Sequence, residues 1–273
     1  MCRKTYPNQL TTWETSTMQK LLTDERFRYW PVCSVAFYAL REKILSCSLS
    51  AWYLYNKRLG IIRYSIQKKK KYETGIIAGG PNEIWHADIT IVKTRDNIKH
   101  YIYLLMDNFS RYILSWRIET YLSAKIRVET IREAYRKFTN GMQRVLLTTD
   151  GGPENDNNEM KSFVGSGGIS MNQVIALKDI PFSNSVIEAQ NRLFKYRYLF
   201  RQDYKNGDEL KHVFASDVSD YNNIRPHISL GGYTPSEAQT GTMGIKEVWK
   251  LQIREAAKVR LAANRNELCE ICR

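Results

Sequence analysis

The sequence predicts an α/β domain with a mixed sheet, preceded by a small region made only of helices. Two features of the 273-residue chain support this fold class. From residue 84 onward, closely spaced runs of alternating apolar residues are typical of antiparallel strands, and further strands then alternate with helical patterns. Before residue 60, the apolar residues recur at helical spacing instead. Three antiparallel strands followed by alternating helices and strands describe a mixed sheet flanked by helices.

The amino-terminal region contains predicted helices separated by a short turn. Segment 46–48 offers an N-cap for a helix that starts at Leu49 and ends with Gly60 at a C-cap position. This order is typical of a helix-turn-helix, and its second helix, which carries Lys57 and Arg58, suits the major groove of DNA. A plain helical bundle packed on the next domain is the alternative.

The positive charge is concentrated in the first part of the chain. The net charge is +13, and residues 1–80 hold 14 basic against 5 acidic side chains, which is +9 of that total. This distribution suits a nucleic-acid-binding region attached to a domain in which positive and negative charges nearly balance. Like charges in a row favour extended backbone, so we expect a basic linker that follows DNA phosphates, with a merely solvated segment as the alternative. The run consists of Lys68, Lys69, Lys70 and Lys71.

Composition excludes several classes of protein. A hydrophobic fraction of 43% with 25% charged residues is that of a globular protein and not of a disordered one. No apolar run reaches the ~18–20 residues that a membrane span needs, and the polar start lacks a signal-peptide core, so we expect a cytoplasmic protein without a membrane partner. The cysteines show no extracellular disulfide pattern, and we expect the pair Cys269 and Cys272 to be a reduced tail and not a zinc site.

The expected organisation has four parts. Residues 1–65 form the helix-turn-helix-like region, residues 66–82 the linker, residues 83–243 the α/β domain, and residues 244–273 a terminal helix and tail. Strands are predicted over residues 84–93, 98–106, 112–118, 145–149 and 169–175. Helices are predicted over residues 124–138, 158–164 and 246–260, and a long helical region is predicted from residue 185 past residue 200.

Three acidic residues are the candidates for chemistry. Asp150 closes the apolar strand 145–149, Asp88 lies within strand 84–93, and Glu188 lies in the first turns of the long helical region. In open α/β sheets, catalytic and ligand-binding residues commonly lie at the ends of strands, as Asp150 does. Convergent acids without a cysteine or histidine cluster indicate hard divalent cations, and these indicate phosphoryl chemistry. Asp107, in contrast, is expected to make a turn between two strands.

The segments around these acids resemble the catalytic core of DDE transposases of bacterial insertion sequences and of retroviral integrases. They are Trp85-His86-Ala87-Asp88-Ile89-Thr90, Thr149-Asp150-Gly151-Gly152, Ser183-Asn184-Ser185-Val186-Ile187-Glu188-Ala189, and Tyr221-Asn222-Asn223-Ile224-Arg225-Pro226-His227 followed by Gly231-Gly232-Tyr233-Thr234-Pro235-Ser236-Glu237-Ala238. The resemblance covers about residues 80–240. It implies a ribonuclease-H-like fold in which Asp88, Asp150 and Glu188 bind two Mg²⁺ ions, or Mn²⁺ in their place.

The same resemblance implies an activity and partners. The expected activity is transposition: metal-dependent transfer of a DNA 3′-OH onto a target phosphodiester. The alternatives are a nuclease of the same fold that cuts without joining, and a DNA-binding remnant without activity. The expected partners are DNA, both element ends and target, and further copies of the chain. Because such transposases often carry more sequence before the helix-turn-helix, a shortened copy or the product of a split reading frame is also expected.

Two basic residues follow the third acid on the same predicted helix. Arg192 and Lys195 stand four and seven residues after Glu188, and this spacing places them on its face. We expect them to hold phosphates of the DNA end near the metal ions. A solvated ion pair along the helix is the alternative.

Overall fold

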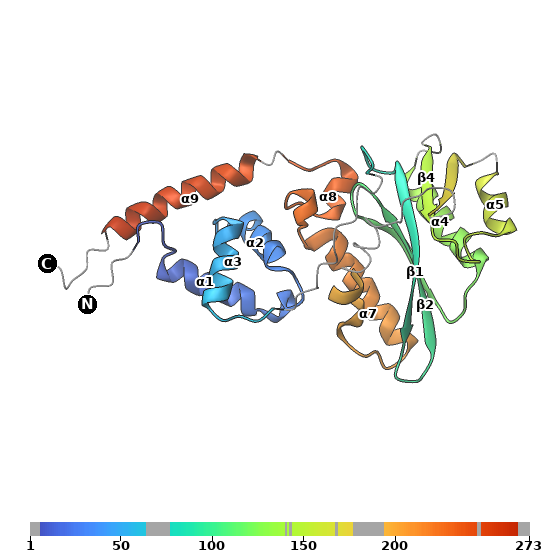
Figure 1. Cartoon of the computed structure of the whole chain (residues 1–273), viewed down its shortest axis with the longest axis horizontal. Helices are drawn as coiled ribbons and strands as arrows, with labels where there is room; N and C mark the ends of the chain where they lie inside the picture. Colours follow the sequence, from blue (N-terminus) through green and yellow to red (C-terminus); the bar gives the residue numbers. More distant parts are fainter. Residues whose placement is uncertain are drawn as a thin grey trace. The chain divides into compact units, whose positions relative to one another are not determined.

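The computed structural model describes residues 6–63, 77–139, 141, 144–166, 169–176, 194–244 and 247–266. The chain divides into two compact units (Figure 1). One unit is helical and combines residues 1–65 with residues 225–233 and 243–273. The other contains the sheet and combines residues 66–224 with residues 234–242.

The sheet has five strands in the order β3-β2-β1-β4-β5. The strands are β1 (Ile84–Lys93), β2 (Lys99–Asp107), β3 (Ile113–Glu119), β4 (Val145–Thr149) and β5 (Met171–Ile175). β1, β2 and β3 are antiparallel neighbours, whereas β4 runs parallel to β1 and β5 runs parallel to β4. The predicted mixed sheet is therefore confirmed.

Helices cover both faces of this sheet (Figure 1). On one face, α4 (Ala124–Phe138) and α5 (Asn158–Val164) pack against Trp85, Ala87 and Leu105. On the other face, α7 (Gly207–Ser219) packs against Leu104 and its neighbours. Because successive side chains of a strand point to opposite faces, Ala87 and Asp88 belong to different sides of β1.

Local contacts explain where the elements begin and end. β1, α4, β4 and α5 have their predicted bounds. β5 begins at Met171, two residues later than predicted, because the amide of Ile169 donates to the Ser166 carbonyl in a turn and the amide of Ser170 donates to the Tyr135 hydroxyl. Residues 194–197 are helical and lead into the 3₁₀ turn Leu199–Arg201, after which the backbone is extended.

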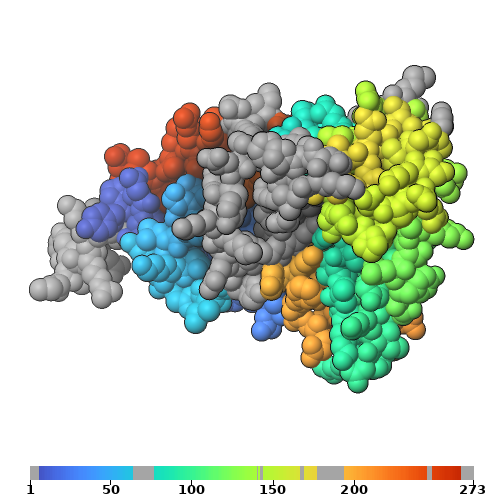
Figure 2. All heavy atoms as spheres, turned by 45° about the vertical axis from the view of Figure 1, so that its right-hand side comes forward, coloured from blue at the N-terminus to red at the C-terminus, as the bar shows by residue number. Residues whose placement is uncertain are grey.

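The β1–β2 hairpin lies beside the segment that leads into α7 (Figure 2). The amide of Arg95, in the turn of the hairpin, donates to the carbonyl of Tyr204 at 2.9 Å. Close by, His100 occupies the space in which a side chain at Gly207 would lie, since an added Cβ would come within 2.6 Å of its ring. The far end of the sheet is thereby fixed to the helix that covers it.

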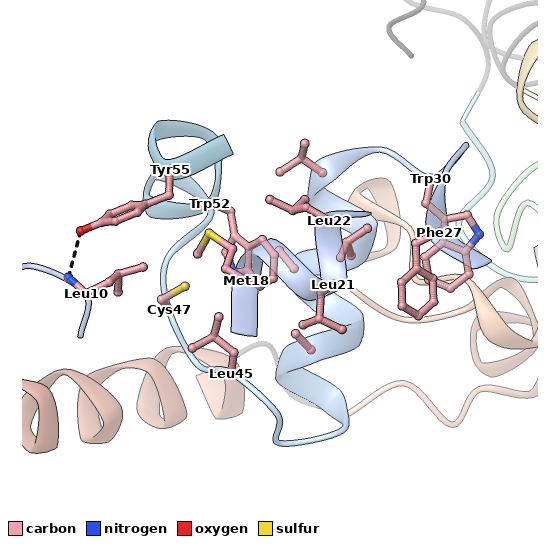
Figure 3. Packing of buried hydrophobic residues seen from close by; sticks show 14 residues of the cluster. Leu10, Met18, Leu21, Leu22, Phe27, Trp30, Leu45, Cys47, Trp52 and Tyr55 are labelled. Atoms are coloured by element: carbon pink, nitrogen blue, oxygen red, sulfur yellow. Dashed lines mark hydrogen bonds between the residues drawn. The ribbon is translucent and has the colours of Figure 1, made fainter. Parts of the chain in front are cut away.

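The helical unit is built around one apolar core (Figure 3). Its first three helices are α1 (Thr12–Thr23), α2 (Val32–Arg41) and α3 (Leu49–Arg58). Met18, Val35 and Trp52 are fully buried between them, and the Leu10 amide donates to the Tyr55 hydroxyl at 3.0 Å. Ser48 caps α3 by accepting from the Ala51 amide, as the sequence predicts.

The helix α9 (Glu247–Asn266) belongs to the same unit and is held at several points. Arg260 donates to both carboxylate oxygens of Glu14 on α1, at 2.7 to 3.0 Å. The side-chain amide nitrogen of Asn264 donates to the backbone carbonyls of Pro7 and Gln9 at 2.9 and 2.7 Å. These contacts explain why the helix continues past residue 260, where the sequence predicts its end.

Candidate active site at the edge between β1 and β4

The strand register brings two of the three predicted acids together. β1 and β4 pair in parallel up to His86 and Thr148, and β4 then ends at Thr149 while β1 continues. Asp88 and Asp150 each stand two residues beyond this last pair. Both acids therefore lie at the level of the sheet where β1 loses its neighbour β4.

Asp88 forms an ion pair with Lys195. The Lys195 ammonium lies 3.0 Å from Oδ2 of Asp88, and about a quarter of each side chain is exposed, 24% and 26%. Lys195 is held there by its neighbour Phe194, which is fully buried and contacts the rings of Tyr198 and Tyr221 at centroid distances of 5.1 and 5.2 Å. The residue that the sequence assigns to DNA thus contacts a predicted acid.

Asp150 is oriented by a buried asparagine in the loop that follows β4. The amide nitrogen of Asn155 donates to Oδ1 of Asp150 and, at 3.2 Å, to Glu154. Asn155 is fully buried, and Gln173 of β5 donates to its carbonyl at 2.8 Å and to the Thr149 hydroxyl at 3.1 Å. The sequence analysis missed Asn155 and Gln173. The sequence could have indicated Asn155, because it lies only five residues after Asp150, which ends a predicted strand.

A buried arginine lies behind the acids. Arg127, in the first turns of α4, is 0% exposed, and its guanidinium lies over the ring of Tyr103 at 5.2 Å. Burial lowers the pKa of Arg127, and the carboxylates of Glu154, Asp88 and Asp150 oppose this shift. The sequence analysis also missed this residue.

Asp107 has the turn role that the sequence predicts. It is fully buried, and its carboxylate accepts from the amide and hydroxyl of Ser110 at 2.8 and 3.0 Å and from the amide of Asn82 at 2.7 Å. Burial raises the pKa of Asp107 above its ordinary value, and these hydrogen bonds offset only part of that rise. The contacts to Ser110 stabilise the turn between β2 and β3, and the contact to Asn82 joins this turn to the segment before β1.

The remaining candidate residues lie elsewhere or outside the described residues. Lys57 and Arg58 lie in the last turn of α3, where the Arg58 guanidinium covers the Tyr55 ring at 5.2 Å. Four sets of predicted residues fall outside the described ranges: Glu188, Arg192, Lys68 to Lys71, and the pair Cys269 and Cys272.

The donor set suits a hard cation, but only part of it can be placed. Asp88 and Asp150 supply carboxylate oxygens, the ligands that Mg²⁺ prefers. Among the described residues, no group of three or more histidine, cysteine, aspartate or glutamate side chains is arranged to hold a metal ion. The third predicted ligand, Glu188, lies outside those residues. The two acids that can be placed therefore fit the expected cation as an incomplete set.

Comparison with known proteins gives consistent matches. Two family models, each described as an integrase core domain, match residues 78–173 and 178–235. A transposase for insertion sequence element IS629 of Shigella sonnei is 24% identical over 191 residues, covering 67% of this chain and 60% of its own length. Transposase InsF of insertion sequence IS3A from Escherichia coli is 22% identical over 166 residues, covering 60% of this chain.

These matches are partial in length. The aligned part spans 60% of the first relative and 56% of the second. Among solved structures, the HTLV-2 integrase catalytic core domain in complex with magnesium aligns with a TM-score of 0.44 and 18% identity, covering 59% of this chain and 98% of that one. Within the described residues, no helix has the length and apolar character to cross a membrane.

Proposed function

Because the chain belongs to the DDE transposase and integrase catalytic-core family, we propose that it is a transposase. The reaction is the attack of a DNA 3′-OH on a phosphodiester of target DNA, as in the movement of an insertion sequence. The observation that supports this proposal is the parallel register of β1 and β4, since Asp88 and Asp150 each stand two residues beyond its last pair.

In this proposal, Asp88, Asp150 and Glu188 hold two Mg²⁺ or Mn²⁺ ions. When bound, such ions activate a hydroxyl nucleophile and stabilise the leaving oxygen of an in-line displacement. The protein contributes the placement of the ligands. Asn155 fixes the orientation of Asp150, and Gln173 fixes the loop that carries Asn155.

Lys195 has two successive partners in this scheme. Its ammonium forms an ion pair with Asp88. If a divalent cation were bound to the Asp88 carboxylate, Lys195 would be available to hold a phosphate of the DNA end, since a lysine ammonium binds phosphate as a point charge. Arg192 is proposed to act on the same DNA end.

DNA binding is proposed to involve the basic residues before the sheet. Lys57 and Arg58 on α3, together with Lys68, Lys69, Lys70 and Lys71, supply sequence-independent contacts to phosphates. Element ends and target DNA are the proposed ligands. Copies of the chain are proposed to assemble on them inside a bacterial cell, because two DNA ends must be joined to one target.

The decisive experiment measures joined products. Labelled DNA ends from the flanks of the gene are incubated with the protein, Mg²⁺ and target DNA, and nicked and joined products are separated. We expect joined product with the wild-type chain and its loss in Asp150→Asn. An unchanged yield in Asp150→Asn refutes the mechanism. Nicked product alone indicates a nuclease, and metal-independent binding without cleavage indicates a DNA-binding remnant.

A further inference from the structure

Arg127 is a buried charge without adequate local partners. Its side chain is 0% exposed, and its Nη1 donates to the Leu104 carbonyl at 3.4 Å. Nε and Nη2 are buried and find no hydrogen-bond partner among the residues that the structure describes. Within the described part of the chain, Arg127 forms no ion pair at 4 Å or less.

Such an arrangement is expensive for a folded protein. A buried ion destabilises the fold by several kcal/mol unless opposite charges and hydrogen bonds compensate it. The place on the helix adds to the cost, because the amino-terminal end of a helix disfavours a positive charge. The cation–π contact of Arg127 with the Tyr103 ring offsets only part of this cost.

The compensation comes from the candidate active site. Leu104, whose carbonyl accepts from Arg127, is the register partner of Asp88 across β1 and β2. Arg127 approaches from the face covered by α4, whereas Lys195 reaches Asp88 from the other face. Burial lowers the pKa of Arg127, and the negative charges of Glu154, Asp88 and Asp150 oppose that shift.

We propose that Arg127 is a positioning residue that serves as the internal counter-charge of the acid site. Carboxylates that converge without a cation repel one another, and a fixed positive charge behind them offsets that repulsion. Arg127 thus keeps β1 and the loop after β4 in place before any divalent ion binds. This inference rests on the acid site of the proposed function, but it concerns the metal-free protein and needs no catalysis.

The test is hydrogen–deuterium exchange of the full-length chain in EDTA, measured over residues 84–93 and 145–155. The variants are Arg127→Met, which removes the charge at similar length, and Arg127→Lys, which keeps it. We expect exchange in Arg127→Met to be about fivefold faster or more, the size of a typical coupling between contacting groups, and near wild-type in Arg127→Lys. Saturating Mg²⁺ is expected to restore the protection of Arg127→Met.

A double-mutant cycle with Asp150→Asn separates this role from simple packing. If Arg127 offsets carboxylate repulsion, Asp150→Asn reduces the damage that Arg127→Met causes in EDTA. Additive effects, or an Arg127→Met variant with wild-type exchange in EDTA, overturn the proposal. If Arg127→Met does not fold alone, folding of the double variant supports the proposal and its failure to fold overturns it. Failure of the proposed function shows separately, as absence of joined DNA with the wild-type chain.

Discussion

Replacement of Asn155 by alanine should separate the orientation of Asp150 from the stability of the fold. The variant loses a hydrogen bond to an ionised carboxylate, a type of bond that contributes about 1.5–3 kcal/mol. If this energy serves the geometry of the reaction, strand transfer slows about 10- to 100-fold, at roughly 1.4 kcal/mol for each tenfold. The fold loses little, because the bond from Gln173 is to the backbone of Asn155 and survives the substitution.

Asn157→Ala is the matched control. Asn157 lies in the same loop and caps α5 by accepting from the Met160 amide at 2.9 Å. Its loss costs about 1 kcal/mol of stability but leaves Asp150 untouched. Single-turnover strand transfer and thermal unfolding are measured for both variants. Equal rates in the two variants, or a rate loss in Asn155→Ala that follows its stability alone, refute the reasoning.

Two further predictions concern the ion pairs. Arg260→Met leaves Glu14 as a buried unpaired charge and should reduce the free energy of unfolding of the helical unit by about 3–5 kcal/mol in denaturant titrations, more than the paired Glu14→Gln/Arg260→Met variant does. Burial raises the pKa of Glu14, but hydrogen bonds from Arg260 and Thr11 outweigh it and leave the pKa below its ordinary value. The ionised Glu14 carboxylate therefore contributes its full stabilisation at pH values above its ordinary pKa. This stabilisation is lost as the pH falls through the lowered pKa. An equal loss of stability on acidification in Glu14→Gln would contradict this. Lys195→Met removes the cation that competes for Asp88, so the metal-free variant should bind Mn²⁺ about five- to tenfold more tightly in a titration, whereas Lys195→Arg should not; weaker binding by Lys195→Met would argue against the competition.

The sheet could be predicted from the sequence because its pattern is local. Strand alternation defined β1, and a strictly amphipathic pattern defined α4, so both were predicted with their observed bounds. The position of Asp150 just after β4 followed from the same logic, since an open sheet places functional residues at strand ends. In this part of the chain, local preference and tertiary structure agree.

The contacts that hold Asn155 and Arg127 in place could not be predicted, because they depend on partners distant in the sequence. Gln173 reaches Asn155 across 18 positions, and Arg127 reaches Leu104 across 23. A single arginine in an amphipathic helix normally indicates an exposed position, yet Arg127 is fully buried. Only the folded arrangement shows which charges surround it.

The motif at residues 221–238 resembles the family for a structural reason. The side chain of Asn222 exchanges hydrogen bonds of 2.9 and 3.1 Å with the amide and carbonyl of Ile113, and so acts as a ladder partner for the edge strand β3. Gln239, just after the motif, accepts from the Ser110 hydroxyl at 2.6 Å. Residues 225–233 between them belong to the helical unit. The motif therefore fixes the framework where the chain passes between the two units. A match to it is evidence of fold, whereas evidence of activity must come from variants of the acids.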